Sequence, residues 1–299
     1  MKFNTFCLST LTFGAFSLIN PFQTIGADGN WADKIPTPVT NPLFFEEAQI
    51  RSDVRPIFIH HRLQNTIDGA APLPGSVPLG GDAQVYAIQL RYAINDRLAL
   101  IATKDGYIDF NPDATLAQDD GFADIAFGLK YAIINDEENQ FLLTPGLKFE
   151  LPSGNTGVLQ GNGSGEWNLF LSAAKGWDDF SLASHFGIRL PNDFDEETSS
   201  LHYGLQAAYE LHPCFTPFAA VNAFTVLSEG DGLPLEAEGF DLVNFGASAA
   251  EGATQVAVGF GFRSRLTDYC DLGFAYEFGV TERDDIFDDR YTVDLVFRF

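Results

Sequence analysis

Apolar residues alternate with small or polar residues in segments of about ten, and this alternation restricts the fold of the chain more than any other feature. Within residues 122–134, for example, every second position from Ile125 to Tyr131 is apolar. Successive side chains of a strand point to opposite faces, so each segment predicts a strand with one apolar and one polar face. Such segments occur at residues 50–61, 84–93, 97–108, 122–134, 141–151, 167–173, 180–190, 201–211, 215–227, 255–263, 272–280 and 290–299.

The connections between these segments alternate between short polar turns and long loops. Residues 135–139 form a short turn, whereas residues 153–165 and residues 228–252 form long loops. This arrangement is typical of outer-membrane barrels, which have short periplasmic turns and long extracellular loops. We therefore predict an all-β chain that folds into a transmembrane antiparallel β-barrel of about 12 strands. A secreted β-sandwich with a dry core is the alternative, because periodicity alone does not exclude it.

Aromatic residues on the apolar faces favour the barrel over the sandwich. Some of them fall at strand ends beside the short turns, and others lie near the long loops. In a barrel that faces lipid, aromatic residues form two girdles at the membrane interfaces. The predicted girdle residues are Tyr92, Tyr131, Phe149, Trp167, Tyr209, Phe278, Tyr291 and Phe299.

The last predicted strand ends on an aromatic residue, Phe299. This C-terminal strand resembles the one by which outer-membrane barrels are handled by their assembly machinery. We therefore expect the barrel-assembly machinery and outer-membrane lipid as partners. In a closed barrel this strand pairs with the strand at residues 50–61, which leaves no free edge.

The N-terminal residues have the features of a secretory signal peptide. An apolar run from Phe6 to Ile19 precedes a suitable cleavage site at Ala27. The run is shorter than the about 20 apolar residues that a spanning helix needs, so we predict a cleaved signal peptide and not a membrane anchor. Together with the predicted barrel, this signal peptide predicts export to the outer membrane of a Gram-negative-type cell. The predicted divisions are a cleaved signal peptide at residues 1–27, a periplasmic segment or lumen plug at residues 28–49, and the barrel at residues 50–299.

The facing of two predicted strands is ambiguous. In residues 50–61, Pro56 cannot donate a ladder hydrogen bond, and neither set of alternating positions is cleanly apolar. In residues 97–108, apolar residues occupy both sets of positions. A register error of one residue would exchange the inward and outward side chains of either strand.

The composition excludes several classes of partner. The formal net charge is −24, and nucleic acid is not expected to bind because phosphate recognition needs a basic face. The cysteines lack metal-binding spacing, so we predict no metal site and no cofactor. The acidic runs at residues 193–197 and 284–289 lack the spacing of a calcium-binding loop and are expected to be solvated loop tips.

Two cysteines remain after removal of the signal peptide, Cys214 and Cys270. Both fall in neighbouring short turns on one side of the barrel, in a compartment that permits disulfides. We predict that they pair. Two separate thiols are the alternative.

The polar faces of the strands supply the candidate residues of the lumen. Charges of both signs occur there, together with neutral polar residues, and they either line a path for solutes or neutralise one another across the barrel. The candidates are Arg91, Lys130, Lys148, Glu150, His185, Arg189, Gln206, Glu210, Arg263, Glu277, Asp294 and Arg298.

Two lysines of this set suggest a preference for anions. Lys130 and Lys148 lie on adjacent strands with both side chains inward, about two rungs apart when counted from a turn centred on Glu137. We expect them to form a basic ladder, near Arg91 and Arg189, which concentrates anionic solutes in a narrow lumen. The alternative is that the acidic candidates Glu150 and Glu210 neutralise this ladder.

The sequence contains no catalytic constellation. Of the five histidines, only His185 and His202 fall in clear strands on the inward face. Ser184 adjoins His185, but neighbours along a strand point to opposite faces. Since no G-x-S-x-G motif is present either, we predict no enzymatic activity and no catalytic residues.

The number of strands constrains the function. Barrels of about eight strands are filled by their own side chains and those of 16–18 leave an open channel, so twelve strands predict a narrow, partly obstructed lumen. We therefore expect a channel or transporter for small solutes. A structural or adhesive barrel that acts through its acidic loops is the alternative.

Three segments carry a family resemblance. Residues 121–131 (GFADIAFGLKY), residues 145–155 (PGLKFELPSGN) and residues 163–165 (GSG) are similar to segments of the outer-membrane family named for the MetA pathway of phenol degradation. The resemblance covers most of the mature chain. It implies a barrel fold and a transport function, and the name of the family associates it with aromatic compounds.

Overall fold

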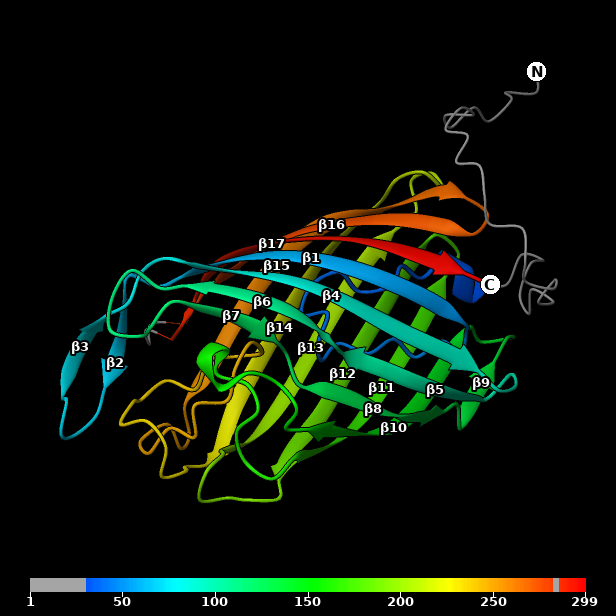
Figure 1. Ribbon diagram of the computed structural model, residues 1–299. Coiled ribbons are helices and arrows are strands. Elements are labelled where there is room, and N and C mark those ends of the chain that lie inside the picture. The colour runs from blue at the N-terminus through cyan, green and yellow to red at the C-terminus, as the bar shows by residue number, and fades with distance from the viewer. Residues whose placement is uncertain (1–30, 282–284) are drawn as a thin grey trace, which may run out of the picture.

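The computed structural model describes residues 31–281 and 285–299, in which the regular secondary structure is almost entirely β-strand (Figure 1). The predicted signal peptide at residues 1–27 lies outside the described residues. The 3₁₀ helices η1 (Trp31–Lys34) and η2 (Thr156–Val158) are short, and no described helix is long and apolar enough to cross a bilayer. The strands are β1 (Asp53–Leu63), β2 (Thr66–Gly69), β3 (Gly75–Pro78), β4 (Asp82–Ala93), β5 (Leu98–Lys104), β6 (Gly106–Asn111), β7 (Asp119–Phe122), β8 (Ile125–Tyr131), β9 (Ile134–Asp136), β10 (Phe141–Leu151), β11 (Glu166–Trp177), β12 (Phe180–Pro191), β13 (Ser199–Tyr209), β14 (Thr216–Ser228), β15 (Thr254–Thr267), β16 (Cys270–Gly279) and β17 (Phe287–Arg298).

Fifteen of these strands form one antiparallel sheet that closes on itself. The strand β1 pairs with β4 on one side and with β17 on the other, so the predicted pairing of the first and last strands is confirmed. Because β5 continues into β6, and β7 into β8 and β9, each of these runs counts as one spanning strand. The result is the predicted closed antiparallel barrel of twelve spanning strands.

The two ends of the barrel differ in their connections (Figure 1). At the short-turn end lie brief turns, such as residues 178–179 between β11 and β12, together with η1 and the C-terminus. At the opposite, long-loop end lie the connections from β10 to β11 and from β14 to β15, and the hairpin of β2 and β3 projects beyond the barrel there.

The wall has an apolar outer face and a polar inner face. On β4, Ile88 is 41% exposed and Leu90 is 45% exposed, whereas Gln89 between them is fully buried. The same alternation continues on most strands, and it is the arrangement of a barrel whose outer face meets lipid. All the predicted girdle residues lie on this outer face.

The facing of β1 is settled by its neighbours. Arg55 and His61 are buried inside the barrel, and Pro56 points outward. The register of β1 with β17 passes from Val54 directly to Ile57, so the ladder is interrupted at Pro56, which has no N–H to donate.

The facing of β5 explains why its sequence was ambiguous. Ala99 and Ile101 point inward and are buried, while Leu100 is 49% exposed on the outside. The pairing with β8 shifts just before Lys104, so that both Thr103 and Lys104 are buried. A bulge of this kind breaks the alternation of side chains, which is why neither set of positions reads as uniformly apolar.

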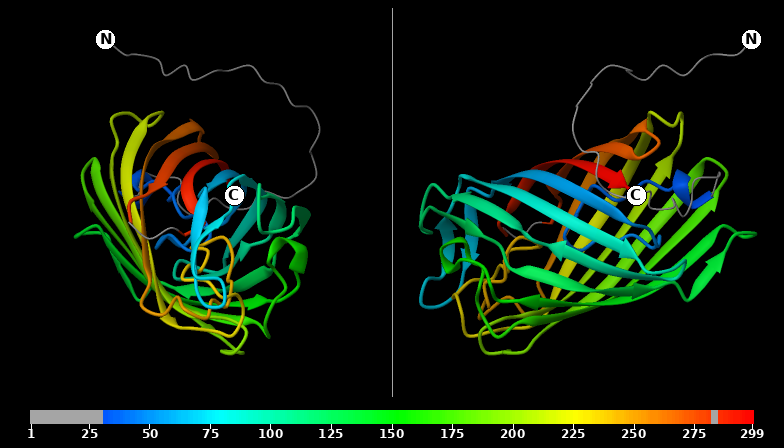
Figure 2. Two further views of the ribbon diagram at one scale, coloured as in Figure 1. Left: turned by 90° about the vertical axis from the view of Figure 1, so that its left-hand side faces the viewer. Right: turned by 45° about the vertical axis from the view of Figure 1, so that its right-hand side comes forward.

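The interior of the barrel is filled by two elements that do not belong to the wall. One is residues 31–49, here called the lumen segment, and Figure 2 shows it in blue within the ring of strands. The other is residues 229–253, here called the lumen loop, which connects β14 to β15 at the long-loop end. Every residue from 35 to 49 is buried. Of the two locations expected for residues 28–49, the described part therefore occupies the lumen.

Candidate functional site

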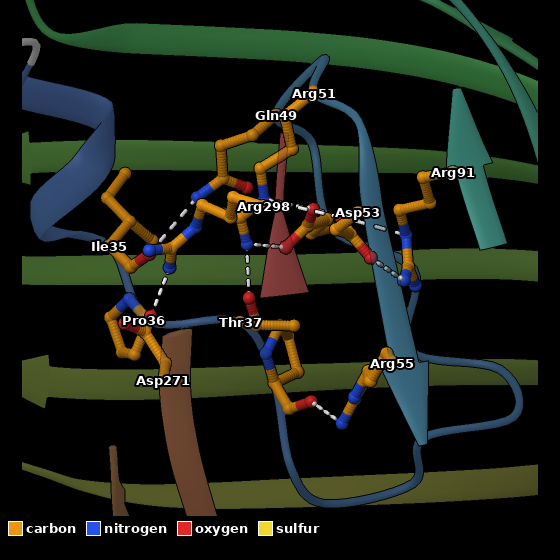
Figure 3. Close-up of polar contacts among 12 residues, drawn as sticks. Ile35, Pro36, Thr37, Gln49, Arg51, Asp53, Arg55, Arg91, Asp271 and Arg298 are labelled. Atoms are coloured by element: carbon orange, nitrogen blue, oxygen red, sulfur yellow. Dashed lines mark hydrogen bonds and ion pairs between the residues drawn. The ribbon is translucent and has the colours of Figure 1, made fainter. Parts of the chain in front are cut away.

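The lumen segment is a re-entrant loop that starts and ends at the short-turn end. At its tip the N–H of Phe45 donates to the carbonyl of Asn41 at 2.9 Å, and Asn41 has a φ of 45°, which asparagine tolerates. At its base the side chain of Gln49 donates to the carbonyl of Ile35 at 3.3 Å, and Arg51 contacts the side chain of Thr37 (Figure 3). The segment is thus closed on itself before it meets the wall.

Proline determines how the segment meets the wall. Pro36, Pro38 and Pro42 lack an N–H and favour extended backbone, in which carbonyl groups have no internal partner. The wall therefore supplies the donors, and Figure 3 shows Arg55 of β1 among them. The wall side chains that donate to carbonyls of the segment are Arg265, Gln206, Arg263, Arg55, Gln89, Lys148, Ser172, Lys130 and Thr144.

One carboxylate of the lumen segment lies between two cations of the wall. Glu46 accepts from Arg91 at 2.7 and 2.8 Å and from the ammonium group of Lys130 at 2.7 Å. Arg91 also lies 3.2 Å from Asp53, and all four side chains are at most 3% exposed. Buried charges are stable only when they are paired and hydrogen-bonded, and here the segment provides the pairing.

The two predicted ladder lysines are adjacent on the inner face, but they are closer than expected. Lys130 lies opposite Gly146, which is two residues from Lys148, so the offset is one position on the same face. The hairpin turns about Glu138 rather than about Glu137, which accounts for the difference. The group that neutralises Lys130 is Glu46, and neither Glu150 nor Glu210 does so.

Two further charged clusters lie inside the barrel on the strands around its seam. Asp294 of β17 binds both Arg55 of β1, at 2.6 Å, and Arg263 of β15. Glu277 of β16 accepts from Arg290 at 3.0 Å and from the backbone N–H of Asn41 at 3.2 Å. Both clusters therefore connect the wall with itself and with the lumen segment.

The remaining charged candidates are paired with residues of the wall or lie near its short-turn end. Arg189 donates to Glu166 at 2.8 Å, and Glu150 accepts from Lys104 at 2.5 Å. Arg298 donates to Asp271. Glu210 follows the end of β13 and borders a small hollow at the short-turn end together with Lys34.

The predicted inward residue His185 belongs to an aromatic group in the middle of the lumen. Its Nε2 lies 2.5 Å from Nδ1 of His202, whose Nε2 is 2.7 Å from the amide nitrogen of Asn168. A Cβ at Gly187 would overlap with the His202 ring, so only glycine permits this close approach. The two imidazole rings therefore make polar contacts with each other and with the side-chain amide of Asn168. Within the described ranges no group of three or more His, Cys, Asp or Glu side chains is placed to hold a metal ion.

The lumen loop occupies the long-loop end of the interior. Its residues Leu235, Leu242 and Phe245 join the largest apolar cluster of the molecule, to which the wall contributes Ile59 and Ile108. The sequence predicted a long extracellular loop at residues 228–252. The structure shows that its apolar residues draw it into the barrel, since burial of such side chains stabilises the folded chain by about 1.5–3 kcal/mol each.

Two buried acidic residues of the lumen loop help to hold it in place. Asp241 accepts from Arg290 of β17 at 2.7 and 2.9 Å. Glu238 accepts from backbone N–H groups of the loop itself, including that of Ala247 at 2.9 Å. These carboxylates are buried, so they are not available on the surface as an acidic loop would be.

The lumen loop is also joined to the loop between β12 and β13. The side chain of Asn244 donates to the carbonyl of Thr198 at 3.1 Å and accepts from its N–H at 3.1 Å. The neighbouring Glu197 is 8% exposed, and burial together with the charge of Glu166 raises its pKa to about 7. This carboxyl lies beside Gly163 of the connection from β10 to β11, next to the contact between the two loops.

The spaces left inside the barrel are small. One cavity of about 10 Å³ borders Lys148, Asn168 and Phe44, and another of about 20 Å³ borders Arg189 and Phe240. Each has room for about one water molecule. A larger hollow of about 540 Å³ lies among the loops at the long-loop end. The lumen segment and the lumen loop thus close the barrel in this structure.

The predicted disulfide between Cys214 and Cys270 is wrong, because Cys270 is a free, buried thiol. Cys214 precedes β14, whereas Cys270 begins β16, and β15 runs between these two strands. Two strand spacings amount to about 10 Å, which exceeds the about 7 Å over which a disulfide can form.

Several residues of the site were not predicted. Glu46 lies in the lumen segment, for which two locations were open, and Arg55 lies in the strand whose facing was ambiguous. Asp241 lies in a loop that was expected at the surface. The sequence feature that could have pointed to Glu46 is its position in a proline-rich segment directly before the first strand.

The chain matches no protein-family model and no curated protein. Among solved structures it is similar to the COG4313 outer membrane channel from Pseudomonas putida F1, with 15% identity over 89% of this chain and 100% of that chain and a TM-score of 0.63. It is also similar to the NanC porin, with 10% identity over 83% of this chain and 100% of that chain and a TM-score of 0.51. The translocator domain of the autotransporter NalP from Neisseria meningitidis has 12% identity, with 83% of this chain and 89% of that chain covered and a TM-score of 0.51. At these identities the similarity shows the fold, which is that of outer-membrane β-barrels.

Proposed function

We propose that the protein is an outer-membrane channel for small anionic solutes, closed in this structure by its lumen segment. The observation that carries the proposal is the position of Glu46 between Arg91 and Lys130. The carboxylate is the counter-ion of two buried cations on the wall. When the lumen segment leaves, these cations are exposed to the lumen and attract anions in its place.

The location follows from the same proposal. The apolar outer face would be covered by the lipid of the outer membrane, with the predicted aromatic girdles at its interfaces. The short-turn end would face the periplasm and the long-loop end the outside. The similarity to an outer membrane channel and to a porin supports a channel, and the MetA-pathway resemblance supports a transporter of that family.

The basic inner face can be tested by charge reversal. In Lys130→Glu/Lys148→Glu, the new carboxylates repel Glu46 and remove two cations from the lumen, so openings should become more frequent and the anion preference should fall or invert. Reversal potentials in a planar bilayer with a salt gradient measure this preference. Arg97→Glu, which changes an exposed residue of a short turn, is the matched control. An unchanged reversal potential in the double variant would overturn the proposal.

A further inference from the structure

The ring of Phe44, at the tip of the lumen segment, occupies a niche formed by neighbouring strands. The ring centroid lies 5.3 Å from Nζ of Lys148 and 5.0 Å from Cζ of Arg189. It lies 4.9 Å from the ring of His202 and 5.3 Å from that of Phe224, the latter at an edge-to-face angle of 81°. The aromatic ring is thus held by two cations and by two other rings, all from the wall.

The niche is an ordered part of the wall. Lys148 of β10 lies opposite Asn168 of β11, which in turn lies opposite Arg189 of β12. His202 of β13 lies opposite Phe224 of β14 in the same way. Because β-sheet register fixes these positions, the niche persists when the lumen segment is displaced.

Within the described part of the chain Lys148 makes no direct ion pair, although Glu150 and Glu166 border the same small cavity. Its side chain is 3% exposed, and its ammonium group donates to the carbonyl of Leu43 at 3.2 Å. Among the described residues no carboxylate lies within 4.0 Å of it, since Glu46 is bound to Lys130 and Glu150 to Lys104. The side-chain oxygen of Asn168 beside it has no hydrogen-bond partner in the described structure. A buried cation without a counter-ion is costly and indicates a place for an anion.

We propose that this niche is a binding site for an aromatic carboxylate, and that Phe44 is its tethered substitute. The ring of the ligand would take the place of the Phe44 ring, and its carboxylate would accept from the ammonium group of Lys148 in place of the Leu43 carbonyl. The ligand thereby supplies the counter-ion that the lumen segment lacks at this point. This inference rests on the proposed channel function and names the class of solute that the channel admits.

The niche can be tested by vacating it. In Phe44→Ala the space of one aromatic ring is freed beside Lys148, so benzoate should bind at least about tenfold more tightly than to the wild-type protein, because it no longer competes with a tethered ring. Isothermal titration of the detergent-solubilised protein measures the affinity. Acetate lacks the ring and benzyl alcohol lacks the charge, and neither should gain affinity.

Phe240→Ala is the matched control, because Phe240 is also a buried ring of the lumen, packed against Phe224 and Phe287 but without a free lysine beside it. This variant should not gain affinity for benzoate. In Phe44→Ala/Lys148→Met the gain should disappear. An equal gain of benzoate affinity in Phe44→Ala and Phe240→Ala would overturn the inference, because any cavity in the lumen would then be enough to bind benzoate.

The wild-type protein provides a second test that does not depend on the folding of variants. Benzoate should increase the frequency of channel openings in a planar bilayer more than acetate does at the same concentration. Equal effects of benzoate and acetate would overturn the aromatic site while leaving an anion channel intact. Loss of anion preference itself would instead be seen in the reversal potential, which separates failure of the proposed function from failure of this inference.

Discussion

The two elements that fill the lumen are held in different ways. The lumen segment is bound through its carbonyl groups and through ion pairs of Glu46 with the wall. The lumen loop is bound mainly through an apolar cluster that includes Leu242 and Phe245, with Asp241 as its ion-pair partner to the wall. The lumen segment thus adds many polar contacts to the apolar packing of Ile35, Val39 and Phe45 against the wall, whereas the lumen loop depends mainly on burial of apolar surface.

This difference indicates which element moves. A solute can replace a carboxylate or a carbonyl at a cation of the wall, because it offers the same kind of contact. A small polar solute cannot replace the packing of leucine and phenylalanine side chains, which depends on their removal from water. We therefore expect the lumen segment to be the part that a solute displaces and the lumen loop to be a fixed narrowing at the long-loop end.

The largest expected effect comes from removing the counter-ion of the lumen segment. Glu46→Ala leaves Lys130 buried without a paired carboxylate and leaves Arg91 with Asp53 alone, and breaking a buried ion pair costs about 3–5 kcal/mol. Amide hydrogen exchange of residues 35–49 should accelerate by roughly two to three orders of magnitude, as measured by mass spectrometry. Exchange in residues 229–253 should not change.

The control for this variant is Glu251→Ala, which removes an exposed carboxylate. It should alter neither region. If Glu46→Ala accelerates exchange in residues 229–253 as much as in residues 35–49, the two elements open together and the comparison between them fails.

A somewhat smaller effect is expected from the apolar attachment. Leu242→Ala leaves a cavity in the cluster of the lumen loop and should weaken its attachment by about 2–5 kcal/mol. Exchange should then accelerate in residues 229–253 and not in residues 35–49. The exposed Leu73 of the projecting hairpin provides the control, and Leu73→Ala should have no effect. Acceleration that spreads to the lumen segment would contradict separate attachment.

The smallest expected effect is a dependence on pH in the loop between β12 and β13, which contacts the lumen loop through Thr198 and Asn244. Because the pKa of Glu197 is about 7 in the folded loops and about 4.5 when they are released, the contact is most stable below about pH 4.5 and loses stability as the pH rises through 7. The charges that face Glu197 are Glu166, Arg189, Glu150 and Lys104. The change should be roughly 1 kcal/mol, given the partial solvent access of this carboxyl.

Exchange of residues 229–253 in the wild-type protein and in Glu197→Gln, compared at each pH, measures this effect. The variant should lose the pH dependence, while Glu196→Gln, at an exposed neighbouring position, should keep it. A pH dependence that persists in Glu197→Gln would assign the titration to another group.

The wall of the barrel could be predicted because side-chain alternation is a local property. A strand such as β10, with apolar residues on every second position, can be recognised without knowledge of its neighbours. The prediction became ambiguous at β5, where a bulge next to Lys104 turns two consecutive side chains inward. A bulge depends on how two strands pair, and the alternation of side chains along one strand gives no information about that pairing.

The contents of the lumen could be predicted only in part. The inward lysines were found from the alternation, but their partner Glu46 was not, because it comes from a segment without periodicity. Residues 228–252 were predicted only as a long extracellular loop, whereas their leucine and phenylalanine residues place this loop inside the barrel. Contacts between irregular segments and a wall depend on tertiary structure and leave no repeat in the sequence.

The seam between β1 and β17 also has a consequence for the order of events during assembly. Most pairings of the wall join strands that follow each other in the chain, whereas this seam joins residues near position 57 to residues near position 294. Contacts of such long range form late. Arg55, which binds Asp294 across the seam, also donates to the carbonyl of Pro38. The pairing that closes the barrel thus places its arginine against the lumen segment, and we therefore expect closure of the wall and seating of the segment to be coupled through Arg55.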